Sequence, residues 1–241
     1  MLDLNLYPAD IAGLAFFIAA WMIYHFMVET RGRNGGGLNA IMNNYRVDWM
    51  TTMADRESRI VDSAIMASLQ NGTAFFASTS LLAVGGSAAL LRATDDALKV
   101  FADLPFGLAS SRGLWEIKVL GLIAIFGYAF FKFSWSYRLF NYTAILIGAT
   151  PQASRSEPVV RHKAALRAAH MNIAAASHFS RGQRAFFFAL AYLGWFAGPY
   201  VFIITTGAVM FVMWSRQFSS DARRAALFSD AEIPPTKPDA A

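Results

Sequence analysis

Four long apolar stretches dominate the chain and predict an all-α polytopic membrane protein. They cover residues 11–28, 72–91, 114–133 and 185–214. A helix needs about 20 mostly apolar residues to cross the hydrocarbon core of a bilayer. We therefore expect about four transmembrane helices and additional amphipathic cytoplasmic helices, all within one membrane domain over residues 1–214.

The third and fourth stretches exceed the length that one crossing requires. No proline occurs between residues 114 and 149, so the third span is expected to continue past the membrane as a helix until Pro151 stops it. Residues 185–214 carry no charge and contain Pro199. A proline bends a helix, and this stretch is therefore predicted to be one kinked or tilted span.

The polar segments 29–60 and 134–184 are each expected to hold a further helix. Apolar residues from Leu38 to Met53 follow a helical period, which indicates an amphipathic helix lying on the membrane surface. Residues 157–178 form an alanine-rich helix with one basic face. Contact with anionic lipid headgroups is the favoured role of this basic region, and partner docking is the alternative; its residues are Lys163, Arg167, His170, Arg181 and Arg184.

The distribution of positive charge predicts an orientation in the inner membrane. The segments 29–60 and 132–184 hold most of the Lys and Arg residues outside the spans, and such loops stay in the cytoplasm. With four spans, both termini would lie outside. Arg216, Arg223 and Arg224 in the tail conflict with this assignment, and an odd number of spans would remove the conflict. The Pro-rich tail, residues 215–241, is expected to be mostly disordered.

The composition narrows the classes of function. Only 15% of the residues are charged, 56% are hydrophobic and mean hydropathy is +0.37, which disfavours a cytosolic enzyme and excludes disorder for most of the chain. The net charge of +5 fits loops that face anionic lipid, not nucleic acid. Because the chain has no cysteine, disulfides and thiolate ligands are excluded. The first ten residues lack Lys and Arg, so the first apolar stretch is expected to be retained.

Small residues recur at helical spacing in two of the stretches. Such ridges let helices approach closely inside a bilayer, either within one chain or between copies of it. The candidates for a packing or homo-oligomer interface are Ala74, Ser78, Gly86, Gly194 and Gly198.

Arg138 is the candidate for a structural ion pair beyond the third span. Four acidic residues of the first long loop are expected on the same side of the membrane, and a half-buried charge requires a partner. We predict pairing with Asp48, Asp55 or Asp62; the alternative is that Arg138 snorkels to the interface, together with Lys132.

Signals of catalysis are absent from the sequence. His25, His170 and His178 lack the spacing of a metal or haem site, and neither a P-loop nor a nucleophile elbow occurs. We therefore predict no enzyme activity, no metal and no cofactor.

Three long segments of the chain resemble a known family. They are NAIMNNYRVDWMTTMADRESRIVDSAIMASLQNGTAFFASTSLL, KFSWSYRLFNYTAILIGATP and HFSRGQRAFFFALAYLGWFAGP. They are similar to the uncharacterised membrane-protein family of domain of unknown function 599, over about residues 11–214. The resemblance implies a multi-pass helical protein, and it supplies no activity, substrate, cofactor or site residue.

Three functional hypotheses follow from the sequence. The first is a non-enzymatic accessory, scaffold or assembly subunit of an inner-membrane complex, with a homo-oligomer as one form of assembly. The second is a small-molecule or ion transporter or channel built by an oligomer, which the hydroxyl-rich second span and Pro199 favour. The third is a haem or metal redox protein that uses histidines.

Overall fold

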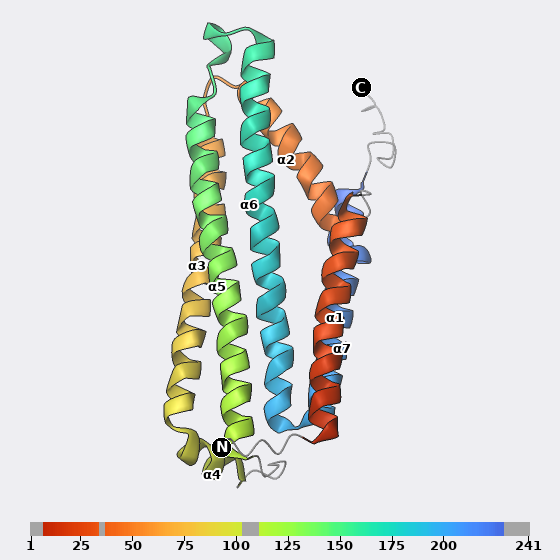
Figure 1. Ribbon diagram of the computed structural model, residues 1–241. Coiled ribbons are helices and arrows are strands. Elements are labelled where there is room, and N and C mark those ends of the chain that lie inside the picture. The colour runs from red at the N-terminus through yellow and green to blue at the C-terminus, as the bar shows by residue number, and fades with distance from the viewer. Residues whose placement is uncertain (1–6, 34–36, 103–110, 229–241) are drawn as a thin grey trace, which may run out of the picture.

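The computed structural model describes residues 7–33, 37–102 and 111–228, and this part of the chain is helical without a strand (Figure 1). Of the first loop, residues 34–36 lie outside it, as do tail residues 229–241, so their predicted structure is not addressed. The elements in order are α1 Pro8–Arg33, α2 Leu38–Ala54, α3 Ile60–Arg92, α4 Thr94–Ala102, α5 Arg112–Ala149, η1 Ala153–Arg155, α6 Pro158–Leu193, η2 Gly194–Ala197, α7 Pro199–Phe218 and α8 Asp221–Ala226.

Four of these helices, α1, α3, α5 and α7, are long and apolar enough to cross a membrane. The prediction of an all-α, multi-pass membrane protein is therefore confirmed. The 33 residues of α3 and the 38 residues of α5 rise roughly 50 and 57 Å as helices. Because a hydrocarbon core is about 30 Å thick, both helices extend well beyond it. The predicted continuation of the third span past residue 133 is thus present, and α5 ends before Pro151.

The prediction of a single fourth span over residues 185–214 is wrong. Residues 185–193 complete α6, and the chain then reverses through η2 before α7 begins. Gly198 has a φ of 129°, a conformation that side chains disfavour, and Pro199 occupies the first turn of α7. A hydropathy pattern has no signal for this reversal because both flanking helices are apolar. The chain therefore runs along the bundle five times, as α1, α3, α5, α6 and α7 (Figure 1).

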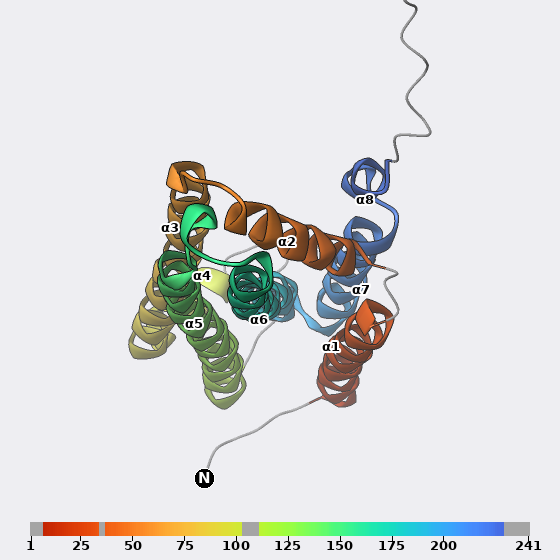
Figure 2. The ribbon, with the colours of Figure 1, turned by 90° about the horizontal axis from the view of Figure 1, so that it is seen from above.

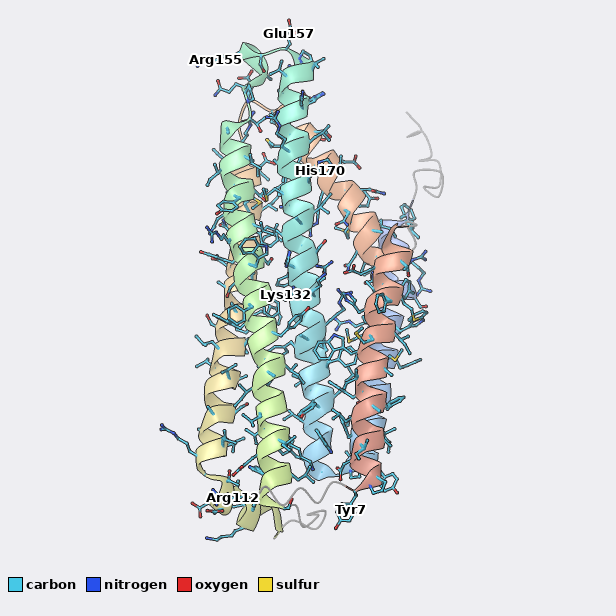
Figure 3. The ribbon with its side chains drawn as sticks, viewed as in Figure 1. Tyr7, Arg112, Lys132, Arg155, Glu157 and His170 are labelled. Atoms are coloured by element: carbon cyan, nitrogen blue, oxygen red, sulfur yellow. The ribbon has the colours of Figure 1, made fainter. Side chains whose placement is uncertain are left out.

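The first and last spanning helices, α1 and α7, consequently place the two chain ends differently from our expectation. Helices α1 and α7 are parallel, since Gly13 lies beside Phe202 and the Tyr24 hydroxyl donates to the Met213 carbonyl at 3.2 Å. Pro8 and Phe218 therefore lie at opposite ends, and the expectation of both termini on one side is wrong. We refer below to the Pro8 end and the Pro158 end of the bundle. Figure 3 labels Tyr7 and Arg112 at the first end and Arg155 and Glu157 at the second.

The tail begins as helix. Residues 215–218 complete α7, and α8 follows; α8 contacts α2, where the Tyr45 hydroxyl donates to the Ala226 carbonyl at 3.0 Å. The expected disorder is therefore wrong for this part of the tail.

Helix α2 packs along α6 and does not lie alone on a surface (Figure 2). Its buried residues are Ile41, Met50, Met53 and Ala54. They join alanines of α6 and residues of α5 in a core near the Pro158 end. The amphipathic pattern predicted the helix correctly, but its apolar side covers protein and not lipid.

Helices α5 and α6 are in close contact at Gly182. A Cβ atom there would stand 2.7 Å from the ring of Phe133. That ring is fully buried and packs between Phe76 and Phe179, with centroid distances of 5.4 and 5.5 Å. Phe133 therefore has little room to move away.

We predict that Gly182→Ala destabilises the protein, because overpacking a tight core contact costs about 1–3 kcal/mol. The matched control is Gly127→Ala on α5, where an added Cβ meets no atom within 4 Å. Thermal unfolding in mild detergent should show a lower midpoint for Gly182→Ala alone. Equal midpoints for the two variants would contradict the assigned packing.

Candidate functional site

A cavity of about 570 Å³ lies beside α2 and is the candidate site. Its walls are the end of α1, the first half of α2, the middle of α3 and the middle of α6, which contribute residues within 28–29, 38–46, 68–73 and 176–184. Phe140 of α5 adds a further apolar wall. This volume falls within the usual range of pockets for small ligands, about 300–1,000 Å³.

Two helices, α1 and α3, independently show at which level along the bundle the pocket lies. Val28, which lines it, is the last residue of the first apolar stretch, and Gly72, which also lines it, is the first residue of the second. The pocket therefore lies where the apolar, membrane-spanning parts give way to the polar extension. At this level of a bilayer the lipid headgroups are found.

Three guanidinium groups and one carboxylate line the pocket. Arg181 of α6 donates to Glu29 Oε1 of α1 from Nε at 3.0 Å and from Nη2 at 2.6 Å. Arg184, which also lines the pocket, makes no hydrogen bond and no close ion pair within the described part of the chain, although the Glu29 carboxylate is near enough to attract it electrostatically. Glu29, the single carboxylate of the lining, is thus bound to Arg181. Arg46 and Arg184 make no ion pair with an acidic residue in the described part of the chain.

The hydrogen-bond partner of Arg46, on α2, is a neutral side chain. Its Nη1 donates to Asn172 Oδ1 at 2.5 Å, and its buried Nε has no acceptor among the described residues. Burial lowers the pKa of Arg46 from its usual value, although a guanidinium stays charged in proteins. A half-buried cation without a counter-charge is unfavourable, and an anion in the pocket would relieve this.

The first turn of α2 supplies further donors at the same place. Leu38 and Asn39 line the pocket, and the preceding Gly37 offers no side-chain cap. The N–H of the next residue, Ala40, already donates to the Gly37 carbonyl at 3.0 Å. The first N–H groups of a helix lack intrahelical acceptors and favour anions. Together with Arg46 and Arg184, they make the pocket a candidate site for an anionic group.

The predicted pairing of Arg138 with an aspartate is wrong. Arg138 faces outward on α5, where its Nε donates to the Tyr142 hydroxyl at 2.7 Å and its guanidinium lies 5.7 Å from the Trp135 ring centre. Two of the three candidate aspartates, Asp55 and Asp62, instead pair with cations that lie closer to them than Arg138. Asp55 pairs with Arg161 at 2.8 Å and lies 3.0 Å from His162.

The other predicted acids also have different roles. Asp62 is fully buried and accepts from Trp49 Nε1 at 2.7 Å and from Arg56 Nη1 at 2.8 Å, which fixes the corner between α2 and α3. Asp48 is exposed on α2.

The small-residue candidates separate into two groups. Gly194 lies against Thr205, whose hydroxyl donates to the Ala191 carbonyl at 2.8 Å, and with Gly198 it forms the reversal between α6 and α7. On α3, the side facing α5 instead buries Thr73, Ser80 and Ser87. The remaining candidates lie on more accessible positions of α3, and association between copies there stays a prediction; these are Ala74, Ser78 and Gly86.

The basic residues of α6 also separate. Arg181 and Arg184 line the pocket, whereas Lys163, Arg167 and His170 are exposed nearer the Pro158 end, where Figure 3 labels His170. Lys163 precedes Arg181 by 18 residues, about 27 Å along a helix. Contact of all five with one layer of headgroups would therefore require the extension to approach the membrane.

The histidines do not form a metal site in the described part of the chain, which holds no suitable group of His, Cys, Asp and Glu. His25 lies 3.8 Å from Glu29, close to the pocket, while His178 lies near Trp135.

A second buried polar cluster, which the sequence analysis missed, lies at the Pro8 end. Trp195 Nε1 donates to Asp10 Oδ1 at 2.7 Å, and Lys118 Nζ donates to the Trp195 carbonyl at 2.8 Å. Asp10 and Lys118 are both almost completely buried. The cluster connects α1, α5 and η2, and the signal for it was a lysine inside an apolar stretch.

The comparison with known proteins gives one match. The family model described as "Protein of unknown function, DUF599" matches residues 12–222, a range that contains every wall of the pocket. No curated protein and no solved structure matches the chain.

We predict that Arg56→Ala destabilises the protein and Arg138→Ala does not. Loss of Arg56 leaves the buried carboxylate of Asp62 without its counter-charge, and an unsatisfied buried group costs about 1–3 kcal/mol or more when it is charged. Removal of the exposed Arg138 should change stability by less than about 0.5 kcal/mol. Both variants replace an arginine with an alanine, so their unfolding midpoints can be compared directly in one detergent. A larger effect at Arg138 would contradict the described pairing.

Proposed function

Because the chain belongs to the DUF599 family, whose description names no activity, we propose a role from its own pocket. The protein binds the anionic headgroup of a membrane amphiphile between α1, α2, α3 and α6, as a non-enzymatic accessory component of the inner membrane. The observation that carries the proposal is the pair Arg46 and Arg184, which line one cavity without an acidic partner among the described residues.

The composition of the walls supports an amphiphile. The arginines, Asn39 and Asn43 offer donors to a polar head, and Leu69 and Phe179 offer apolar surface to the remainder of the molecule. A pocket at the depth of the headgroups receives such a ligand from the bilayer without carrying its charge through the hydrocarbon core, which would be costly.

The donor chemistry supports binding over catalysis. The only carboxylate of the lining, Glu29, already accepts both hydrogen bonds from Arg181. Guanidinium groups remain protonated and therefore stabilise an anion without exchanging protons with it.

The distribution of charge supports a cytoplasmic Pro158 end. This end carries both long basic segments, and the parallel course of α1 and α7 adds Arg216, Arg223 and Arg224 to the same side. The conflict seen with four spans disappears when α6, which contains residues 185–193 of the fourth apolar stretch, is counted as a crossing in addition to the four most apolar helices. On this basis the pocket opens at the level of the inner leaflet, and the N-terminus is outside.

We predict that the protein purified in mild detergent retains an anionic lipid, and that Arg46→Gln combined with Arg184→Gln loses it. Each hydrogen bond to a charged group contributes about 1.5–3 kcal/mol, so retention should fall more than tenfold. Native mass spectrometry measures the bound lipid. The exposed Arg138→Gln is the control, and equal retention by all three proteins would overturn the proposal.

Cysteine labelling tests the orientation, because the natural chain has no cysteine. Asp96→Cys places a thiol at the Pro8 end, and Ser219→Cys places one directly after α7; both positions are exposed. A membrane-impermeant maleimide added to intact cells should label Asp96→Cys alone, and disruption of the membrane should expose Ser219→Cys. Labelling of Ser219→Cys in intact cells would reject the five-crossing orientation.

A further inference from the structure

The net positive charge of the pocket indicates how much negative charge its ligand carries. Arg181 is neutralised by Glu29, which it contacts through two nitrogen atoms. Arg46 has only the neutral Asn172 as a partner, and Arg184 has none among the described residues. Two positive charges, one on α2 and one on α6, therefore remain to be balanced.

Common anionic headgroups differ in the charge that they offer. A phosphodiester or a carboxylate carries a single negative charge, whereas a phosphate monoester carries about −1.5 to −2 near pH 7. A monoanion would leave one half-buried guanidinium uncompensated, which is unfavourable. From this balance we propose that the pocket binds the terminal phosphate monoester of an amphiphile. The inference rests on the proposed function and narrows its ligand to one chemical class.

The hydrogen-bond donors of the site fit the same group. Arg46 lines the pocket, and the hydrogen bond from its Nη1 to Asn172 fixes the plane of the guanidinium. Arg184 makes no hydrogen bond to another described residue, and arginine forks bind phosphate through two parallel hydrogen bonds. A monoester presents three unesterified oxygen atoms to such donors, one more than a diester.

The first turn of α2 supports the assignment. Leu38 and Asn39 line the pocket at the start of a 17-residue helix whose N-cap, Gly37, adds no side-chain oxygen. A phosphate group is a good ligand for such a helix start when basic side chains converge beside it. The glycine also leaves this turn free of a negatively charged cap that would compete with the ligand.

The apolar remainder of the ligand has a place beside the site. Gly72 of α3 lines the pocket, and a Cβ atom added there would meet no neighbouring atom within 4 Å. On the same helix the exposed side chain of Phe75 follows. A hydrocarbon chain that leaves the pocket at this point would lie along α3 within the bilayer.

The test measures lipid preference on the full-length protein after exchange into detergent. Native mass spectrometry compares short-chain phosphatidic acid, a monoester, with phosphatidylglycerol, a diester that has the same acyl chains. At pH 7.5 we expect at least a tenfold preference for phosphatidic acid. Because the second pKa of the phosphate is about 6, the preference should decline as the pH falls from 7.5 to 5.5, and this readout requires no variant.

Variants then assign the preference to individual residues. Arg184→Gln and Arg46→Gln, each made alone, should reduce binding of phosphatidic acid more than binding of phosphatidylglycerol, so the preference falls. Arg138→Gln should retain the full preference. The unfolding midpoint of every variant is measured in parallel, and the comparison of the two lipids on the wild-type protein stands even if a variant fails to fold.

The outcomes distinguish this inference from the proposed function. Equal binding of the two lipids, or a preference independent of pH, overturns the monoester while leaving an anionic amphiphile in place. Binding of neither lipid overturns both. Inorganic phosphate is the third probe: if it binds as tightly as short-chain phosphatidic acid, the pocket is a site for free phosphate and the proposed amphiphile is wrong.

Discussion

The antiparallel contact between α5 and α6 is the interaction on which the rest of the structure depends. The two helices approach closely because α6 presents small residues along one side, among them Ala168, Ala175 and Gly182, all of them fully or nearly fully buried. The Ser136 hydroxyl donates to the Ala175 carbonyl at 2.8 Å, a bond that only a close approach allows. Such packing is how helices associate where lipid removes the hydrophobic driving force. Helices α2 and α7 also pack against α6, while α3 packs on α5 and α1 packs on α7 (Figure 2).

The unequal lengths of the helices then create the pocket. Helices α3, α5 and α6 continue beyond the level at which α1 ends, and α2 turns to cover the side of α6 that α1 no longer covers (Figure 1). The cavity remains where this change of partner occurs. Its position at the border of the apolar stretches is therefore a consequence of helix length, and its charge follows from the polar residues that helices carry as they leave a membrane.

Several of these features could be predicted from the sequence and others could not, for physical reasons. Length and hydropathy were sufficient for α1, α3 and α5, because a membrane span depends on local composition. The reversal at Gly198 was missed because two apolar helices that meet at a turn have the same hydropathy as one long helix. Arg138 was assigned to an aspartate from helix spacing alone, which gives a side but not a neighbour. Arg181 and Arg184 were recognised as candidates for headgroup contact, while Arg46 looked like part of an ordinary surface helix. Only the packing of α2 against α6 brings it to the same cavity.

The buried charged groups of the bundle form two sets. One set has hydrogen-bond partners inside the protein and stabilises the fold, and the other lines the pocket. At the Pro8 end, Asp10 accepts from the indole of Trp195 and Lys118 donates to the carbonyl of the same residue, so one tryptophan satisfies a buried acid and a buried base. The corner held by Asp62 is similar, since a nearby arginine and an indole converge on one carboxylate. In contrast, Arg46 and Arg184 line one cavity at the border of the apolar stretches and make no ion pair with an acidic residue in the described part of the chain. Arg59 likewise lacks an acidic partner, but three backbone carbonyls accept its hydrogen bonds. Two such arginines at a cavity are explained if the partner is not part of the chain, and that is the property expected of a binding site.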